Sequence, residues 1–255
     1  MATSTPLRDA RLALSLLTAI RTPARWPDEG ATQVAGWFPV VGLLVGAVGY
    51  GIVKIAELLS LSGSATVVLS ALVVIAWALM TRLLHWDGLA DVADGYWGSP
   101  HPARRLEIMS DSRTGAFGAA AVALIAILEV AAIAAILAAP HELPLLVVPV
   151  FARFSATAAA WLGKPARAGG LGRSVMGAPT VLSATIVLLT LAVAFLALWS
   201  GFGVTGVALG SAGVVLALGV PHVLALRFGG VTGDVMGASV LLTEAVLFAG
   251  FALVV

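Results

Sequence analysis

The chain has 255 residues, of which 60% are hydrophobic and 11% are charged, with a formal net charge of +1 and no cysteine. Ordinary soluble domains are about 45–50% apolar, so the composition excludes that class. The missing cysteines exclude disulfides and thiolate metal sites. We expect an all-α integral membrane protein with the lipid bilayer as a partner and no nucleic-acid partner.

The first 30 residues do not resemble a cleaved signal peptide, because arginines interrupt them and no apolar core precedes a cleavage site. Pro6 can begin a helix with Leu7, Leu14 and Leu17 near one face. That helix would be too short and too charged to cross a bilayer. We therefore expect residues 1–30 to form an interfacial N-terminal segment.

About seven later stretches reach the roughly 20 apolar residues that a transmembrane helix needs. Gly42 and Gly46 in the first have GxxxG spacing, which favours close helix packing and is compatible with a homo-oligomer. We expect one polytopic domain over 1–255. The predicted spans are 35–60, 65–84, 119–139, 143–162, 180–200, 204–226 and 237–255.

The basic residues predict an orientation. Of 14 Lys and Arg residues, Lys54 and Arg153 fall within predicted spans. With a cytoplasmic N-terminus, all the others lie on the cytoplasmic side. We therefore expect a multi-pass protein of the cytoplasmic (inner) membrane. Its longest cytoplasmic connection, 85–118, would be the catalytic segment.

That connection begins with HWDGLADVADGYWG, which places Asp87, Asp91 and Asp94 at positions i, i+4 and i+7. On a helix they fall within an arc of about 60°. Like charges at this spacing repel, and a divalent cation with a preference for oxygen ligands would offset the repulsion. The alternative is a solvated acidic face. His85 could be a ligand, a proton-transfer group or a simple hydrogen-bonding residue.

The next stretch, RRLEIMSDSRTGAFG at 104–118, contains Asp111, Ser112 and Arg113. The Arg113 guanidinium could clamp a phosphate through paired hydrogen bonds, with Ser112 as a further donor. The alternative is a basic loop that only sets topology, which would explain Arg104. Further on, GGVTGDV at 229–235 places Asp234 in another cytoplasmic loop.

Of the charged residues inside predicted spans, three lie away from the span ends, where charge is costly and is functional by default: Glu129, Arg153 and Glu244. A structural ion pair between Glu129 and Arg153 is the alternative.

Taken together, HWDGLADVADG, EIMSDSRTGAFG, a later GLG and GGVTGDVMGASVLLTE resemble the cobalamin-5′-phosphate synthases, also called adenosylcobinamide-GDP ribazoletransferases. The family pattern is close to H-x-D-G-L-A-D-x-x-D-G, then M-x-D-S-R-x-G-x-F-G, then G-G-x-T-G-D with a glutamate some ten residues on. The matching positions spread from 85 to 244, and the combination is specific where each part alone is not.

The resemblance implies that α-ribazole, or its 5′-phosphate, attacks adenosylcobinamide-GDP with Mg²⁺ as cofactor. GMP would leave and adenosylcobalamin, or its 5′-phosphate, would form, late in cobalamin (vitamin B12) biosynthesis. Asp94 or His85 would be the general base. The implied metal ligands are Asp87, Asp91, Asp94 and Asp111; the catalytic residues Asp94, His85 and Arg113; and the substrate-binding residues Arg104, Ser112, Arg113, Asp234 and Glu244.

Two other classes of protein are alternatives. CDP-alcohol phosphotransferases also use clustered aspartates, but their D-G-x-x-A-R-x8-G-x3-D-x3-D pattern is absent, with Asp91 near the expected A-R. An ion-coupled transporter would place more acidic residues at mid-membrane and would usually show internal repeats, which the chain lacks.

Overall fold

The computed structural model describes residues 5–26, 33–61, 65–167 and 169–254. Residues 1–4 and 27–30 of the predicted interfacial segment lie outside these ranges. The described residues are helical and contain no strand, apart from one isolated bridge between Pro165 and Val231. The elements are α1 (Pro6–Leu17), η1 (Val34–Trp37), α2 (Phe38–Leu58), α3 (Thr66–Met80), α4 (Leu84–Gly98), α5 (Pro102–Ile108), α6 (Ala116–Ala138), α7 (Leu143–Leu162), α8 (Leu171–Val175), α9 (Val181–Phe228) and α10 (Gly233–Ala252).

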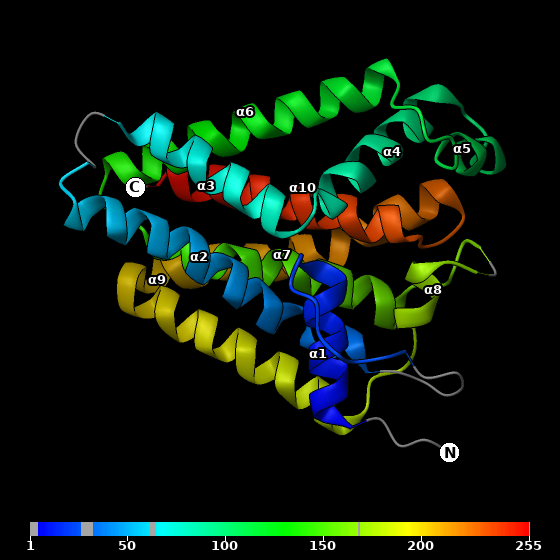
Figure 1. The fold of residues 1–255 in the computed structure, drawn as a ribbon, viewed down its shortest axis with the longest axis horizontal. Coiled ribbons are helices and arrows are strands. Elements are labelled where there is room, and N and C mark those ends of the chain that lie inside the picture. Colours follow the sequence, from blue (N-terminus) through cyan, green and yellow to red (C-terminus); the bar gives the residue numbers. More distant parts are fainter. Residues whose placement is uncertain (1–4, 27–32, 62–64, 168, 255) are drawn as a thin grey trace.

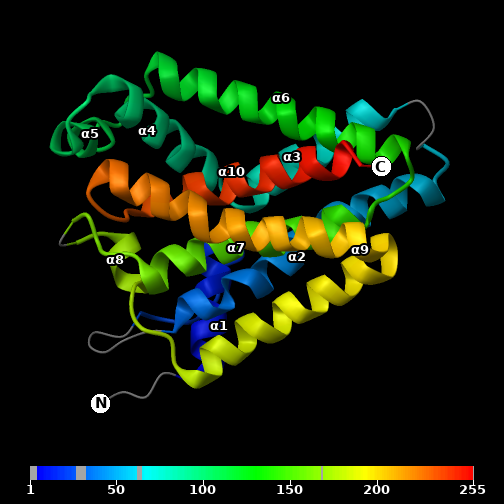
Figure 2. The same cartoon turned by 180° about the vertical axis from the view of Figure 1, so that it is seen from behind.

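Within the described ranges, five helices are long and apolar enough to cross a membrane, and the chain is a multi-pass membrane protein by this measure. The bent pair α3 and α4 makes a sixth if it counts as one span. The sequence predicts about seven spans. This is one more than six because α9 contains two of the predicted spans, 180–200 and 204–226. This 48-residue helix leaves helical geometry at Gly203, with φ 56° and ψ −133°. Figure 2 shows the two arms of α9, yellow and orange, folding back from that point.

Helix α1 runs across the direction followed by α2, α7 and α9 (Figures 1 and 2). Its buried side includes Leu12 and Leu17, which belong to the core. At its C-terminal end the Arg82 guanidinium donates hydrogen bonds to the carbonyl oxygens of Ser15 and Leu16, at 3.2 and 3.1 Å. These contacts hold α1 against the turn between α3 and α4.

Helix α7 lies at the centre of the bundle and packs against α2, α9 and α10. Gly42 and Gly46 of α2 face its backbone so closely that a Cβ atom at either position would overlap carbonyl oxygens of Pro149 or Leu146. The predicted close packing is therefore confirmed, and it occurs within one chain. Because this contact within one chain accounts for the GxxxG spacing, the spacing is no evidence that two copies of the chain associate.

The predicted catalytic segment 85–118 contains two helices, α4 and α5, and reaches the start of α6. The chain turns by 89° between α3 and α4, where Arg82 and Leu83 have positive φ angles of 53° and 56°. Helix α4 then packs along α10 and α6. Gly88 makes this approach possible, because a Cβ there would lie 2.9 Å from the carbonyl oxygen of Asp234. The acidic helix is thus part of the packed bundle.

A valine at position 46 tests the packing of α2 against α7. We expect Gly46→Val to lower the free energy of unfolding by about 3 kcal/mol or more, because the α7 backbone cannot move aside. Gly51→Val is the matched control, since no atom lies within 4 Å of a Cβ built there. Thermal unfolding in detergent measures both, and equal stability of the two variants would contradict this packing.

Candidate active site

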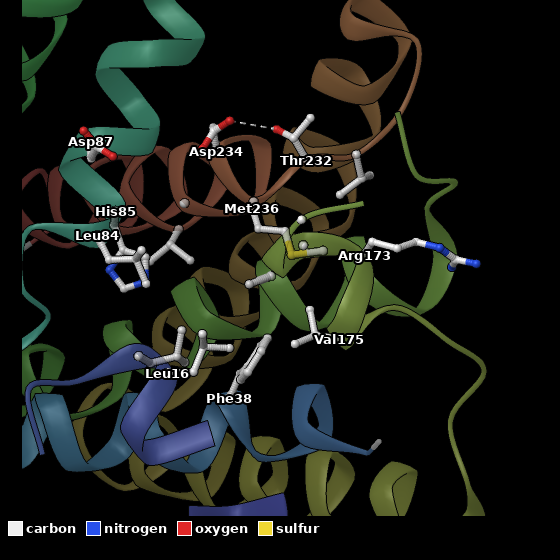
Figure 3. Close-up of a pocket in the computed structure, with 18 of the residues that line it drawn as sticks. Leu16, Phe38, Leu84, His85, Asp87, Arg173, Val175, Thr232, Asp234 and Met236 are labelled. Atoms are coloured by element: carbon white, nitrogen blue, oxygen red, sulfur yellow. Dashed lines mark hydrogen bonds between the residues drawn. The ribbon is translucent and has the colours of Figure 1, made fainter. Parts of the chain in front are cut away.

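A cavity of about 300 Å³ lies where α4 and the start of α10 meet α1, α2, Arg167 and residues 169–175 (Figure 3). Its walls are of two kinds. The polar residues are His85, Asp87, Arg167, Arg173, Thr232 and Asp234, and the apolar ones include Leu16, Leu17, Phe38, Leu84, Val175, Met236 and Val240.

The polar wall brings together carboxylates from opposite ends of the sequence. Asp87 comes from the first turn of α4 and Asp234 from the first turn of α10. The Thr232 hydroxyl accepts a hydrogen bond from the Val235 N–H at 3.1 Å and donates one to Asp234 at 3.3 Å. Asp91, half-buried, interacts electrostatically with both aspartates and with the Arg167 guanidinium. The predicted acidic cluster is therefore joined by a residue from the third motif.

Two glycine-rich stretches build the wall beside these carboxylates. The Val231 N–H donates to the Lys164 carbonyl at 2.7 Å, and the Ala166 N–H donates to the Val231 carbonyl at 3.0 Å. A Cβ at Gly172 would lie 2.6 Å from the Gly233 nitrogen, so the two backbones touch. Glycine is needed here because any side chain would separate the segments.

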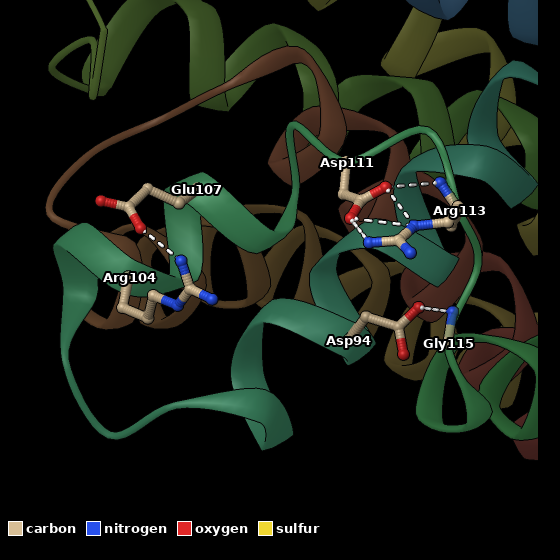
Figure 4. Close-up of polar contacts among 6 residues, drawn as sticks. All are labelled: Asp94, Arg104, Glu107, Asp111, Arg113 and Gly115. Carbon is tan, nitrogen blue, oxygen red and sulfur yellow. Dashed lines mark hydrogen bonds and ion pairs between the residues drawn. The ribbon is translucent and has the colours of Figure 1, made fainter.

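Asp94, predicted as metal ligand and general base, has other partners. It is buried, and its carboxylate accepts hydrogen bonds from the N–H groups of Gly115 at 2.7 Å and Gly118 at 2.8 Å, the first of which is seen in Figure 4. These groups begin α6, where unpaired N–H groups and the helix dipole favour a negative charge. Asp94 does not line the cavity. Its side chain caps α6, and its catalytic roles remain predictions from sequence.

The predicted phosphate-binding residues between α5 and α6 also lie outside the cavity lining (Figure 4). Arg113 is 86% exposed and donates from Nε and Nη2 to Asp111, at 3.0 and 2.6 Å. These hydrogen bonds from the Arg113 side chain lower the pKa of Asp111 to about 2. Arg104 pairs with Glu107 at 2.6 Å, and Ser112 is exposed. The structure therefore does not bring this group to Asp87.

A second, much smaller cavity of about 10 Å³ lies among the helices, lined in part by His85, Glu129, Arg153 and Glu244. All four side chains are buried. Arg153 donates to Glu244, and this ion pair joins α7 to α10. The alternative pair of Arg153 with Glu129 is not the one that forms. Glu244, predicted to bind substrate, lies in this cluster and not in the larger cavity. His85 lines both cavities, and its Nε2 has no hydrogen-bond partner among the residues that the structure describes.

Among the described residues, no group of three or more His, Asp or Glu side chains has the geometry to hold a metal ion. The predicted shell of Asp87, Asp91, Asp94 and Asp111 is divided, because Asp94 caps α6 and Asp111 pairs with Arg113. Carboxylates that face one another still suit a divalent cation, since oxygen ligands of like charge are what Mg²⁺ favours. Asp87, Asp91 and Asp234 repel one another electrostatically, but in the described part of the chain they do not form such a group.

Sequence reasoning missed Arg167 and Thr232 as site residues. In the sequence, Arg167 is only one of the basic residues that predict the orientation, although it lies two residues before the glycine-rich run 169–172. Its side chain interacts electrostatically with Asp91 and Asp234 and donates a hydrogen bond to the Leu106 carbonyl. Each of these two residues lies beside a glycine-rich loop, and this position is the sequence signal that could have identified them as site residues.

These features define a polytopic helical membrane protein with a cavity at one end of its bundle that has a charged side and an apolar side. A sequence model described as cobalamin-5-phosphate synthase matches residues 9–252. The chain belongs to this family, and the predicted resemblance is confirmed.

Three curated relatives, each named adenosylcobinamide-GDP ribazoletransferase, are similar over nearly their whole length. The protein from Syntrophobacter fumaroxidans is 39% identical, covering 94% of this chain and 96% of its own. That from Synechococcus elongatus is 36% identical, covering 94% of each. That from Bradyrhizobium diazoefficiens is 40% identical, covering 91% and 88%. No solved structure matches.

Removing the Asp94 carboxylate tests its capping role. We expect Asp94→Ala to lower the free energy of unfolding by about 0.5–2 kcal/mol, the usual cost of losing a helix cap. Asp94→Asn should lose less, because its amide oxygen still accepts one bond. Thermal unfolding in detergent measures both, with Glu107→Ala on the exposed face of α5 as control. A stability of Asp94→Ala equal to that of the parent would exclude the cap.

Proposed function

We propose that this chain is an adenosylcobinamide-GDP ribazoletransferase acting late in cobalamin biosynthesis. The acceptor is α-ribazole or its 5′-phosphate. Membership of the family over residues 9–252 is the observation that carries the proposal. The acidic cavity supports it, because transfer at a diphosphate needs charged groups that position both substrates.

The reaction is an in-line displacement at phosphorus. The ribose 3′ oxygen of the acceptor forms a bond to the phosphorus that carries the cobinamide. The bond from that phosphorus to the bridging oxygen breaks, and GMP leaves with the electron pair. A base on the protein takes the hydroxyl proton. Of the two predicted bases, His85 is the better placed, because it lines the cavity and Asp94 does not.

We assign Asp87, Asp91 and Asp234 as the residues that would hold Mg²⁺. Their mutual repulsion supports this choice, as does the small number of positive charges among them. When bound, Mg²⁺ neutralises charge on the reacting phosphates. Asp94 and Asp111 are left out because each already has a partner.

Arg167 and Arg173, which line the cavity, are the proposed contacts to the diphosphate. A guanidinium suits this role because it donates paired hydrogen bonds to phosphate oxygens. Arg104, Ser112 and Arg113 remain predictions from sequence. From their positions they would meet only a part of the donor that stays outside the cavity.

We further infer that the two arms of α9 are separate spans, which gives seven crossings with α3 and α4 as one. Cβ atoms built at Gly206 and Gly210 would meet Leu198 and Phe195, so the arms pack closely as an antiparallel pair. The N-terminus and the cavity would face the cytoplasm, as the basic residues predict. The protein would then reside in the cytoplasmic membrane.

Loss of the cation or of one ligand tests the catalytic assignment. With adenosylcobinamide-GDP, α-ribazole and Mg²⁺, the purified protein should release GMP. EDTA should stop the release, and added Mg²⁺ should restore it. Asp87→Asn should lower the rate on the order of 100-fold, because it removes charge needed in the transition state. Glu107→Gln, outside the cavity, should leave the rate unchanged. Release that is insensitive to EDTA, or full activity of Asp87→Asn, would contradict the assignment.

Single cysteines test the orientation, and the cysteine-free chain makes the labelling unambiguous. Ser110→Cys and Ser60→Cys are both exposed positions at opposite ends of the bundle. In intact cells a membrane-impermeant maleimide should label residue 60 and leave residue 110 unlabelled until the membrane is opened. The reverse pattern would invert the topology.

A further inference from the structure

We propose that the 300 Å³ cavity is the pocket of the acceptor nucleoside, with the flat aromatic base against the apolar wall and the ribose toward Asp87 and Asp234. The proposal rests on the proposed function and adds which substrate enters the cavity. It also assigns a specificity role to Phe38 and Val175, which no motif contains.

The size of the cavity decides which of the two substrates it can enclose. Pockets that enclose a small molecule measure about 300–1,000 Å³, so this one is at the lower limit. A benzimidazole nucleoside has a size that fits such a volume. A corrinoid that carries a nucleoside diphosphate is several times larger, and only its diphosphate end could enter. The macrocycle must therefore remain outside.

The two walls match the two halves of such a nucleoside. In Figure 3, Asp87, Asp234 and Thr232 lie along one side, and Leu16, Phe38 and Val175 lie along the opposite side. Phe38 is 2% exposed and Val175 is 4% exposed, so these side chains are firmly packed. A planar apolar base gains most by leaving water for such a surface, and an aromatic ring can stack or meet it edge-on.

Charge decides which end of the acceptor faces the carboxylates. The carboxylates of Asp87 and Asp234 accept hydrogen bonds from hydroxyl groups, which the apolar wall cannot do. A ribose supplies hydroxyls, one of which is the nucleophile. In Figure 3 the Arg173 side chain extends outward, away from Asp87 and Asp234, and we place the arriving diphosphate on that side. The acceptor hydroxyl and the donor phosphate would thus meet at the polar wall.

Two changes in the apolar wall test the proposal by separating the two Michaelis constants. Phe38→Leu removes the ring, and Val175→Phe fills the space. We expect each to raise KM for α-ribazole about tenfold, the scale of a small change in an apolar pocket. KM for adenosylcobinamide-GDP should change less than twofold. Trp199→Leu, at an exposed aromatic that lies outside the cavity and outside the family motifs, is the control.

The unmodified protein provides a second measurement that does not depend on variant folding. Free benzimidazole should inhibit competitively against α-ribazole and should not compete with adenosylcobinamide-GDP. A raised KM for the donor alone, or competition with the donor, would assign the wall to the corrinoid and overturn the proposal. Unchanged constants in active variants would also overturn it, as would absence of inhibition. A parent protein that binds benzimidazole but releases no GMP would instead count against the proposed function.

Discussion

The close approach of α4 to the first turn of α10 is the contact on which the site depends. Gly88 lies against the backbone of Asp234, and a side chain there would push the helices apart. The same contact sets Asp87 and Asp91 beside Asp234, which costs electrostatic energy because three negative charges share a confined region. Tight packing elsewhere offsets this electrostatic energy, above all where the glycine face of α2 meets α7.

Beneath the acidic wall, a second set of charges is shielded from water among the helices. Arg153 and Glu244 join α7 to α10, and leaving either side chain without its partner would be expensive at this depth. Glu129 and His85 share the same small cavity. Because His85 also lines the larger cavity, the two cavities share a wall that α4 provides.

In the proposed arrangement, the polar side and the apolar side of the larger cavity would give the two substrates separate routes. A nucleoside would be enclosed, whereas a corrinoid would offer only its phosphate end, so the protein would make few contacts with the macrocycle. The DSRTG run at 111–115 is exposed and internally paired, and it lies away from the cavity. On this proposal it would still face a large donor, and the family motifs would mark different parts of one substrate path.

The sequence by itself determined the class of protein, most helix limits, the family and the shared helix of Asp87, Asp91 and Asp94. Apolar runs of about 20 residues have few stable states outside a bilayer, and the periodicity of a helix sets where each side chain lies around its axis. Neither property says which neighbour a side chain meets. That Asp94 caps α6, that Glu244 pairs with Arg153, and that Asp234 joins the acidic cluster follow from helix packing between segments up to about 150 residues apart. Only the tertiary structure could decide these contacts, because they depend on the relative placement of whole helices.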